Sequence, residues 1–434
     1  MNSKLCFLHL SDIHFKKYNQ EYADVDDDLR HELLNDIRNH AIKELHNISG
    51  ILVCGDIAHS GKANEYEQAS SFLNKICEIF KLEESKVYCV PGNHDVDQEG
   101  CKNDPILLNT QSKLESTTSH IEVNATITEY LSSSSGSGQI LFNHLNNYNT
   151  CFAEKYGCKI DAKKPYWTYQ LKLDDTYSLN IRGINSVIIS SHLDHIFAGN
   201  ERKMVIGEYQ VPIKDDNIIN MTLCHHPPDC WKDPENKLVK FINDRVHIQL
   251  YGHKHIQTIY QNDNTLVVGS GSMQPSRAED KWFPCYNWIT LELISSDEEN
   301  EYIEFKLYPR KYNLLNNRFG ADLENCHEGK LYNQYKININ DNSSEVHIMT
   351  TDGSEKKLTI FSIDDVNDKD LIYHFMSLPY IKRSKLLDKY NVINELDEGK
   401  KHIDILYKVL NEIKVRNCKQ EFWDDIMITE RGRN

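Results

Sequence analysis

Five short segments of the chain carry side chains that can bind metal ions. Each combines carboxylate, imidazole or amide groups within two to four residues: Asp12-Ile13-His14, Gly55-Asp56, Gly92-Asn93-His94-Asp95, His225-His226-Pro227-Pro228 and Gly252-His253-Lys254-His255. This mixture of oxygen and imidazole donors suits Zn, Mn, Fe or Ni better than Ca, which prefers cages made only of oxygen. A glycine precedes Asp56, Asn93 and His253. Glycine allows the tight backbone turns that would aim the following side chain inward.

All five segments directly follow a predicted strand. The strands are apolar runs at residues 5–10, 51–54, 87–90, 221–224 and 247–251. Apolar residues recur at helical spacing over residues 26–48 and 66–80, which predicts amphipathic helices between the first three strands. Alternation of this kind indicates an α/β sheet, in which the carboxyl ends of parallel strands share one edge. The five segments are therefore expected to converge on one site.

The ordered series D-x-H, G-D, G-N-H-D, H-H-P-P, G-H-x-H resembles that of the calcineurin-like metallophosphoesterases, in particular their bacterial phosphodiesterase and nuclease branch. The resemblance covers residues 4–310. It implies an α/β (α+β) fold, a two-layered β-sandwich flanked by helices, with a dinuclear metal centre at the strand ends.

The resemblance also implies a role for each matching position. The expected ligands of the first metal are Asp12, His14 and His255, and those of the second are Asn93, His225 and His253. Asp56 would bridge both ions. His94 would stand near the substrate as general acid, with Asp95 orienting its ring, and His226 would lie farther from the metals than His225.

This site predicts a phosphoesterase. Two cations lower the pKa of a bridging water, and the resulting hydroxide attacks phosphorus while His94 protonates the leaving oxygen. The favoured reaction is phosphodiester hydrolysis on nucleic acid or a nucleotide. Alternatives are a protein or small-molecule phosphomonoesterase and an adaptor with a vestigial metal site. The expected cofactors are two divalent ions, with Mn favoured and Zn, Fe or Ni as alternatives.

Composition limits the partners and the compartment. With 49 Lys and Arg against 65 Asp and Glu, the net charge is −16, which argues against a general nucleic-acid coat or a polybasic membrane binder. No apolar run reaches the about 18–20 residues of a membrane span, and the first residues do not read as a signal peptide. Twelve scattered cysteines without a C-x-x-C pair fit reduced thiols in a cytoplasmic protein.

The chain divides into three predicted regions. Residues 1–310 form the catalytic domain, with residues 100–165 as an insertion that includes a polar SSSSGSGQ loop. Residues 311–364 form a connecting region with short strands and a hairpin turn at 351–354. Residues 365–434 show helical spacing and predict a small adaptor-like module that binds a protein partner or a second copy of the chain.

Other candidates for the site are weaker. His59 follows Asp56 by three residues and could face the site, but a direct role is not the favoured interpretation. His9 lies inside the first predicted strand, where a structural role is expected. Trp167 and Trp282 could stack a nucleobase, although core packing is the favoured role for both.

Overall fold

The structure is a computed structural model that describes residues 4–16, 26–134, 136–194, 202–262, 265–277, 282–294 and 301–339. It also describes single positions in the last hundred residues: Leu371, Phe375, Leu386, Lys389, Tyr390, Phe422, Trp423, Asp425 and Ile426. The chain separates into two compact units, Met1–Glu345 and Val346–Asn434.

The first unit contains two mixed β-sheets. The first has the order β12 (Arg318–Ala321), β11 (Tyr302–Asn313), β10 (Cys285–Ile294), β1 (Lys4–Leu10), β2 (Gly50–Cys54) and β3 (Val87–Val90), with β13 (Asn333–Asn338) also on β11. The second has the order β4 (Trp167–Lys172), β5 (Ser178–Gly183), β6 (Ile218–Cys224), β7 (Ile248–Tyr251), β9 (Thr265–Ser270) and β8 (Gln257–Asn262). Strands β1, β2 and β3 are parallel, as are β5, β6, β7 and β9.

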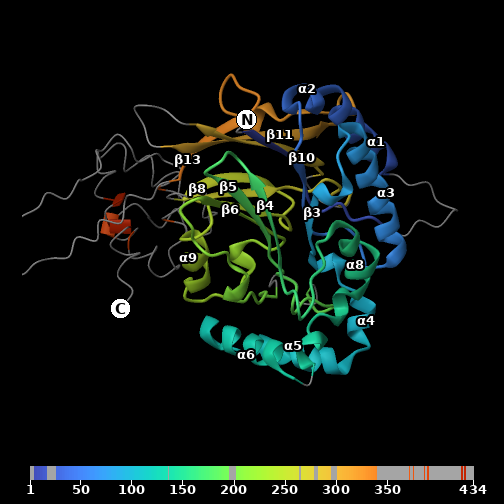
Figure 1. Ribbon diagram of the computed structural model, residues 1–434, viewed down its shortest axis with the longest axis vertical. Helices are drawn as coiled ribbons and strands as arrows, with labels where there is room; N and C mark the ends of the chain where they lie inside the picture. The colour runs from blue at the N-terminus through green and yellow to red at the C-terminus, as the bar shows by residue number, and fades with distance from the viewer. Residues whose placement is uncertain are drawn as a thin grey trace, which may run out of the picture. The chain divides into compact units, whose positions relative to one another are not determined.

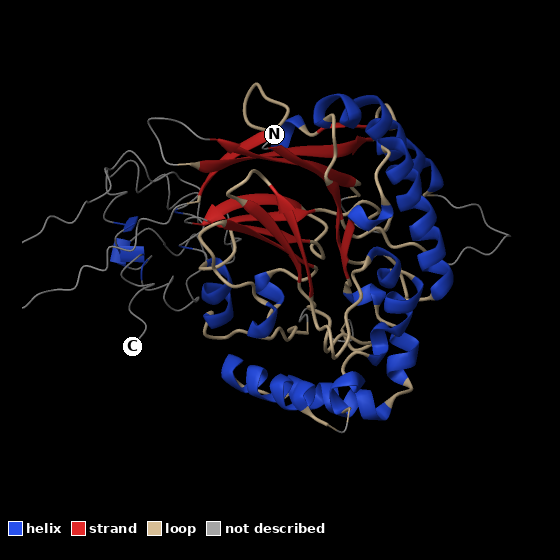
Figure 2. Cartoon of the chain, in the orientation of Figure 1, coloured by secondary structure: helices blue, strands red, loops and turns tan. Residues whose placement is uncertain are grey.

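The two sheets form the layers of a sandwich with helices outside them, as the resemblance implied (Figures 1 and 2). Strands β2, β3 and β7 are buried along their whole length, because the opposite sheet covers one face and further chain covers the other. The indole of Trp167 on β4 donates a hydrogen bond to the carbonyl oxygen of Cys89 on β3 (2.9 Å). Trp167 is therefore a core residue, as predicted.

Helices connect the parallel strands of the first sheet. Between β1 and β2 lie α1 (Asp27–Asp36), one π-helical turn (Ile37–Ala41) and α2 (Ile42–Leu45), which together match the helix predicted over 26–48. Between β2 and β3 lies α3 (Ala63–Phe80), which buries the predicted stripe of Tyr66, Ala69, Leu73 and Ile76. In the second sheet, α9 (Lys237–Asn243) joins β6 to β7.

The insertion after β3 is mostly helical. It contains α4 (Gln98–Lys102), α5 (Pro105–Glu115), α6 (His120–Ser132), α7 (Ser137–Ile140) and α8 (Asn146–Cys151). Asp104 caps α5 by accepting from the backbone amides of Ile106 and Leu107, and Ser119 caps α6. The predicted SSSSGSGQ loop is correspondingly short, since helices end at Ser132 and resume at Ser137.

The first sheet extends past the predicted end of the catalytic domain at residue 310. Strands β12 and β13 both pair with β11, so residues predicted as a connecting region contribute to the sheet as far as Asn338. Arg310 itself is buried and binds both carboxylate oxygens of Asp36 (2.9 and 2.5 Å), which also accepts from the hydroxyl of Tyr286. The predicted hairpin at 351–354 lies outside the described residues.

The second unit is described at few positions, all of them helical. The ring of Phe422 contacts those of Phe375 and Tyr390 (centroids 5.6 and 4.9 Å apart), and the hydroxyl of Tyr390 donates to Asp425 (2.5 Å). Among the described helices of the whole chain, none combines the length and apolar character needed to cross a bilayer.

Candidate metal centre

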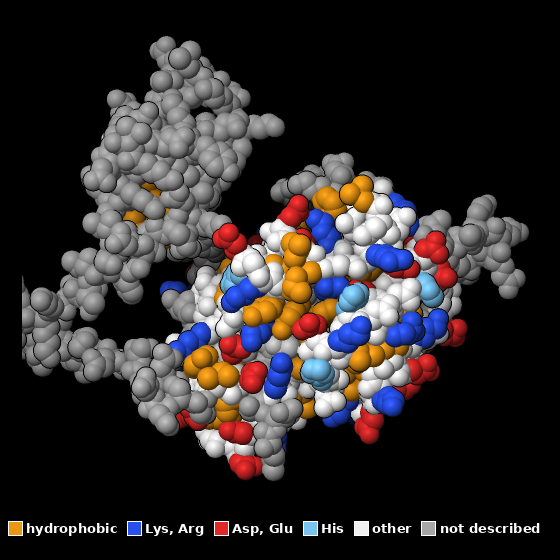
Figure 3. All heavy atoms as spheres, turned by 90° about the horizontal axis from the view of Figure 1, so that it is seen from above, with side chains coloured by type: hydrophobic (Ala, Val, Ile, Leu, Met, Phe, Trp, Pro, Cys, Tyr) orange, Lys and Arg blue, Asp and Glu red, His pale blue; other side chains and the backbone are white. Residues whose placement is uncertain are grey.

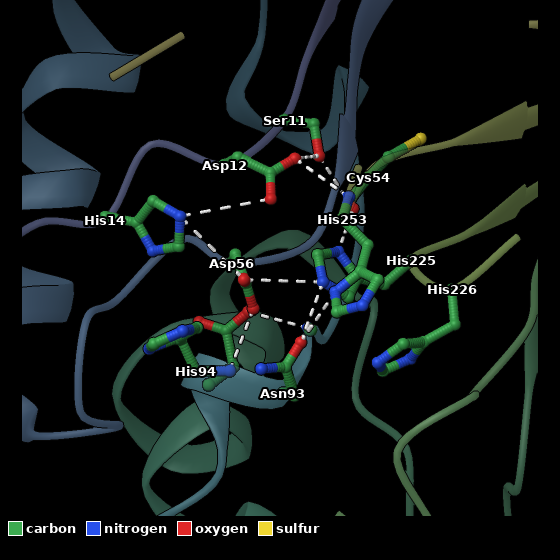
Figure 4. Close-up of polar contacts among 12 residues, drawn as sticks. Ser11, Asp12, His14, Cys54, Asp56, Asn93, His94, His225, His226 and His253 are labelled. Carbon is green, nitrogen blue, oxygen red and sulfur yellow. Dashed lines mark hydrogen bonds and ion pairs between the residues drawn. The ribbon is translucent and has the colours of Figure 1, made fainter. Parts of the chain in front are cut away.

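The five segments meet where the parallel strands of both sheets end (Figure 4). Strands β1, β2 and β3 end just before the first three segments, and β6 and β7 end just before the last two. The loops are tied together by their backbones. The amide of Asp12 donates to the carbonyl oxygen of Gly55, and the amides of Ile13 and His14 donate to that of Asp56. The convergence predicted from the strand ends is therefore present.

Left-handed backbone conformations are concentrated at this edge. Five of the site residues have positive φ angles: Asp12 (53°), His14 (52°), Asp56 (52°), His253 (68°) and His255 (54°). A side chain at positive φ is strained and persists only when the surrounding structure fixes it. Such strain is typical of functional sites, where it aims side chains that a relaxed loop would leave pointing elsewhere.

The glycines that precede the ligands act in two ways. Gly55 has φ of 85° and makes the tight turn expected before Asp56. Gly92 and Gly252 instead permit close approach. A Cβ atom on Gly92 would lie 2.1 Å from Oδ1 of Asp56, and one on Gly252 would lie 2.1 Å from the hydroxyl oxygen of Ser11.

Asp12, His14 and His255 form a first cluster. Oδ1 of Asp12 lies 3.2 Å from Nε2 of His255 and 3.9 Å from Nε2 of His14, and the two imidazole nitrogens are 3.4 Å apart. Oδ2 of Asp12 is occupied separately, because it accepts from the hydroxyl of Ser11 (2.5 Å) and the backbone amide of His253 (3.1 Å). Oδ1 of Asp12 and the Nε2 atoms of His14 and His255 are therefore close enough together to bind one metal ion.

Asn93, His225 and His253 form a second cluster. Oδ1 of Asn93 lies 3.1 Å from Nε2 of His225 and 3.1 Å from Nδ1 of His253. Nδ1 of His225 donates to the carbonyl oxygen of Cys54 (2.8 Å), which leaves the lone pair of the neutral ring on Nε2. The end of β2 thus sets the tautomer that a metal ligand requires.

Asp56 lies between the two clusters. Its Oδ2 is 3.4 Å from Nε2 of His225 in the second cluster and 3.9 Å from Nε2 of His14 in the first. Its Oδ1 accepts from the backbone amide of His94 (2.8 Å), which fixes the carboxylate plane. This placement suits the bridging role predicted for Asp56.

The electrostatics of the centre favour bound positive charge. Asp12 and Asp56 are only 0% and 2% exposed. Burial alone would raise the pKa of Asp56, but the imidazoles of His225, His94 and His14 outweigh it and hold that pKa well below its usual range. Burial lowers the pKa of His225, yet Asp56 and Asp12 raise it to about 9. Two buried carboxylates that draw a proton onto a histidine fit a site built for divalent cations.

His94 stands at the edge of this centre, but its partner differs from the one expected. Nδ1 of His94 donates to the backbone carbonyl of His59 (2.8 Å). The carboxylate of Asp95 instead accepts from the backbone amides of Ile57, Ala58 and Gly92 at 2.8–3.2 Å. Burial and the charge of Asp56 raise the pKa of Asp95 to about 7. Asp95 therefore joins the loop after β2 to the loop after β3, and the orienting group of His94 is a carbonyl.

Two further histidines lie against the centre. The ring of His226 is 4.4 Å from that of His253 between centroids and hydrogen-bonds the hydroxyl of Ser186 (2.9 Å). The ring of His59 stacks on that of His94, with centroids 5.4 Å apart. His59 therefore lies against the centre, and its position three residues after Asp56 is the signal in the sequence that indicates this. His9 is fully buried among Cys54 and Asn287, as expected of a structural residue.

Comparisons with known proteins agree with this geometry. The chain matches the calcineurin-like phosphoesterase family over residues 6–257. It is 24% identical over 380 residues to the metallophosphoesterase-like protein YydB of Bacillus subtilis (strain 168), a match that covers 83% of this chain and 71% of YydB.

Solved structures with partial similarity include Vps29 of Cryptosporidium parvum (11% identity, TM-score 0.31, covering 77% of this chain and 98% of Vps29). Another is GAP50 of Plasmodium (11% identity, TM-score 0.34, covering 78% of this chain and 89% of GAP50). The family match spans more than half of the sequence and includes all five segments. The chain therefore belongs to the calcineurin-like phosphoesterases and is a metal-dependent phosphoesterase.

Proposed function

We propose that the protein hydrolyses phosphodiester bonds in nucleic acid or nucleotides at a dinuclear metal centre. The observation that carries the proposal is the position of Asp56, whose Oδ2 faces both three-residue clusters. The proposed ligands are Asp12, His14 and His255 for one ion, and Asn93, His225 and His253 for the other. Two cations held there would acidify a water molecule and neutralise charge on the phosphate oxygens.

His94 is the proposed general acid. Its Nδ1 proton is committed to the carbonyl of His59, so Nε2 is the nitrogen from which a proton can pass to the leaving oxygen. The backbone amide of His94 is also fixed, because it donates to Asp56. The ring is thereby held at a constant distance from the bridging carboxylate, which gives the proton transfer a defined geometry.

The charge around the centre supports a diester rather than a monoester. The seven proposed ligands are carboxylates, an amide and imidazoles, none of which carries a permanent positive charge. Lys254, which lies close enough to His226 to lower the pKa of its ring, is paired with Asp229 (3.3 Å). A monoester carries more negative charge than a diester, and phosphate sites commonly meet it with arginine forks. We therefore propose that bound metal ions supply most of the positive charge that faces the phosphate.

The identity of the metals and the compartment are also part of the proposal. Nitrogen and oxygen ligands without thiolate favour Mn, with Zn, Fe or Ni as alternatives. The eleven cysteines in the described part of the chain are free thiols, which supports a reducing, cytoplasmic setting. The face shown in Figure 3 mixes Lys and Arg with Asp and Glu, so nucleic acid would be bound at the centre rather than on a broad basic surface there.

Two alternatives remain to be separated from this proposal. A protein or small-molecule phosphomonoesterase would use the same metals, since the fold does not select the substrate. An adaptor with a vestigial site would tolerate loss of ligands, but both clusters and the residue between them are complete.

A comparison of model substrates tests the proposal. With Mn²⁺, bis-p-nitrophenyl phosphate should be hydrolysed faster than p-nitrophenyl phosphate, and a strong preference for the monoester would defeat the proposal. A panel of single- and double-stranded DNA, RNA and cyclic nucleotides would then identify the substrate class. Asp56→Asn serves as the inactive control in each assay, so that contaminating phosphatases are not counted.

For the second unit we propose a role in association, through residues 365–434. The described contacts among Phe375, Tyr390 and Phe422 are those of packed helices. A helical module beside a catalytic unit commonly binds a partner protein or a second copy.

A further inference from the structure

One ligand of the first cluster lacks the support that metal-binding histidines normally have. Such a histidine usually donates its second ring N–H to a carbonyl, a carboxylate or water. His225 follows this rule through the carbonyl of Cys54. His14 does not, because its Nδ1 is buried and has no hydrogen-bond partner among the described residues, while the side chain is only 9% exposed. An unpartnered buried nitrogen is costly and calls for a ligand.

Two other imidazoles lie beside His14. The ring centroid of His94 is 4.8 Å from that of His14, and the centroid of His59 is 6.2 Å away. One ring nitrogen from each of the three histidines lies within 4.8 Å of the other two. In Figure 4 Asp12 lies to the upper right of the His14 ring and His94 lies below it, so the two contact different parts of that ring.

These imidazoles are held by backbone contacts. His94 is fixed through Nδ1 by the carbonyl of His59, so that Nε2 is its acceptor nitrogen. The amide of His59 donates to the carbonyl of Phe15 (2.9 Å), and the next residue, Ser60, donates its amide to Glu65 (2.9 Å). The short loop that carries His59 is thus anchored at both ends. Rotation of the exposed His59 side chain would bring its ring nitrogen closer to those of His14 and His94.

We propose that His14, His59 and His94 form a third cation site, adjacent to the dinuclear centre and sharing His14 with it, that takes Zn²⁺. Three imidazoles with no carboxylate suit Zn²⁺ far better than Mn²⁺ or Mg²⁺, and water can complete a tetrahedral shell. His14 would contribute Nδ1, since its Nε2 faces Asp12 and His255. Forming the Zn–N bond breaks the N–H bond of Nδ1, and one proton leaves for solvent with each ion bound.

The site would regulate the enzyme. A Zn²⁺ ion on His94 occupies the nitrogen that serves the leaving group, so excess zinc should inhibit hydrolysis. This regulation does not depend on which phosphoester is the substrate. It would leave the dinuclear centre loaded, because Nε2 of His14 keeps its first-cluster position.

Metal counting tests the proposal without an activity assay. The full chain is dialysed against increasing Zn²⁺, and zinc and protein are then measured. Wild type should bind three ions per chain and His59→Ala two, because the substitution removes the ring but keeps the carbonyl that holds His94. His31→Ala, which removes an exposed histidine on α1, should still bind three. His59→Gln should also bind two ions, and it shows that the result does not depend on the choice of alanine. Circular dichroism of each variant checks that it is folded.

Two results would overturn the proposal. One is a wild-type protein that stops at two ions with zinc in excess. The other is a folded His59→Ala protein that still binds a third. A titration of hydrolytic activity with Zn²⁺ gives a second test. The rate of each protein is normalised to its own rate at two equivalents of Zn²⁺. The Zn²⁺ concentration that halves this rate should be at least tenfold higher for His59→Ala than for wild type. Equal inhibition of both proteins would contradict the assignment of His59.

Discussion

The candidate catalytic side chains are oriented mainly by backbone groups. His94 is held by the carbonyl of His59, His225 by that of Cys54, and Asp95 by three backbone amides. The motifs indicate which residue types gather, because their order and strand-end positions are visible in the sequence. They do not indicate these backbone partners, since a carbonyl is present at every residue and its direction depends on the folded loop. This is why Asp95 was expected to orient His94 and why His59 was undervalued.

Substitution of His94 tests the role of the general acid. His94→Ala should retain two metal ions per chain, because neither cluster includes this side chain. Its kcat on a diester with an alkyl leaving group should fall by about 10²–10⁴-fold, the usual contribution of a positioned acid. The loss should be smaller with a p-nitrophenolate leaving group, which needs no proton. An equal loss on both substrates, or loss of metal, would argue that His94 acts in another way.

At the scale of elements, the strand ends were predictable and the insertion was not. Strand β3 has the predicted bounds, and β1 and β2 each begin one residue before the predicted start. Short apolar runs bounded by Gly and Asp give a strong strand signal. Helices α4, α7 and α8 are short, and the starts of α5 and α6 are defined by local caps, Asp104 and Ser119, more than by hydrophobic periodicity. The predicted loop was therefore longer than the one observed.

The turn after β3 should be intolerant of any side chain at Gly92. In Gly92→Ala the new Cβ would lie 2.1 Å from Oδ1 and 2.4 Å from the backbone nitrogen of Asp56, so the bridging carboxylate must move. Metal affinity should fall at least about tenfold, as for other losses of ligand support. Gly320→Ala on β12 is the control, because no atom lies within 4 Å of its Cβ. Competition with a fluorescent chelator measures both, and equal affinities would refute the close-approach argument.

The contact between the insertion and the loop after β5 should make stability depend on pH. His144 is 3% exposed and donates to the carbonyl of Val187 (2.8 Å), and burial lowers its pKa to about 4. An unfolded histidine has a pKa near 6.5, so between these values the unfolded chain binds more protons and stability falls as the pH drops. The free energy of unfolding should fall by roughly 3 kcal/mol by pH 4 because of this one group.

Urea unfolding at pH 7 and pH 5 in the presence of a chelator measures this effect. His144→Gln keeps a donor for Val187 and should lose less stability than wild type between the two pH values. His31→Gln, at an exposed position, should follow wild type. If His144→Gln and wild type lose the same free energy, His144 does not titrate in this window.

For the whole molecule, the boundary of the catalytic unit follows the sheet and not the motifs. The last motif ends at His255, but β10, β11, β12 and β13 complete the first sheet far beyond it. Arg310 closes this part of the sheet onto α1 through Asp36. The sequence pattern predicted that the regular alternation of strands and helices ends near residue 310. It could not show that the next short strands return to the same sheet, because pairing partners distant in sequence leave no local signal.

Two truncated chains test this boundary. A chain ending at residue 345 should fold and hydrolyse a small diester, since it keeps all described strands of the first unit. A chain ending at residue 310 loses the end of β11 together with β12 and β13, and should be insoluble or much less stable. The chain that ends at residue 345 should also differ from the full chain in oligomeric state, as measured by light scattering. An unchanged assembly would count against the association role proposed for residues 365–434.

The most direct test of the dinuclear centre is the number of metal ions bound by wild type and by Asp56→Asn. Both proteins are loaded with Mn²⁺, passed over a desalting column and analysed for metal and protein. Two ions per wild-type chain and a clear loss in Asp56→Asn are expected, because an amide cannot replace a carboxylate shared by two cations. A wild-type protein that retains no divalent ion, or an Asp56→Asn protein that retains both, would contradict the assignment.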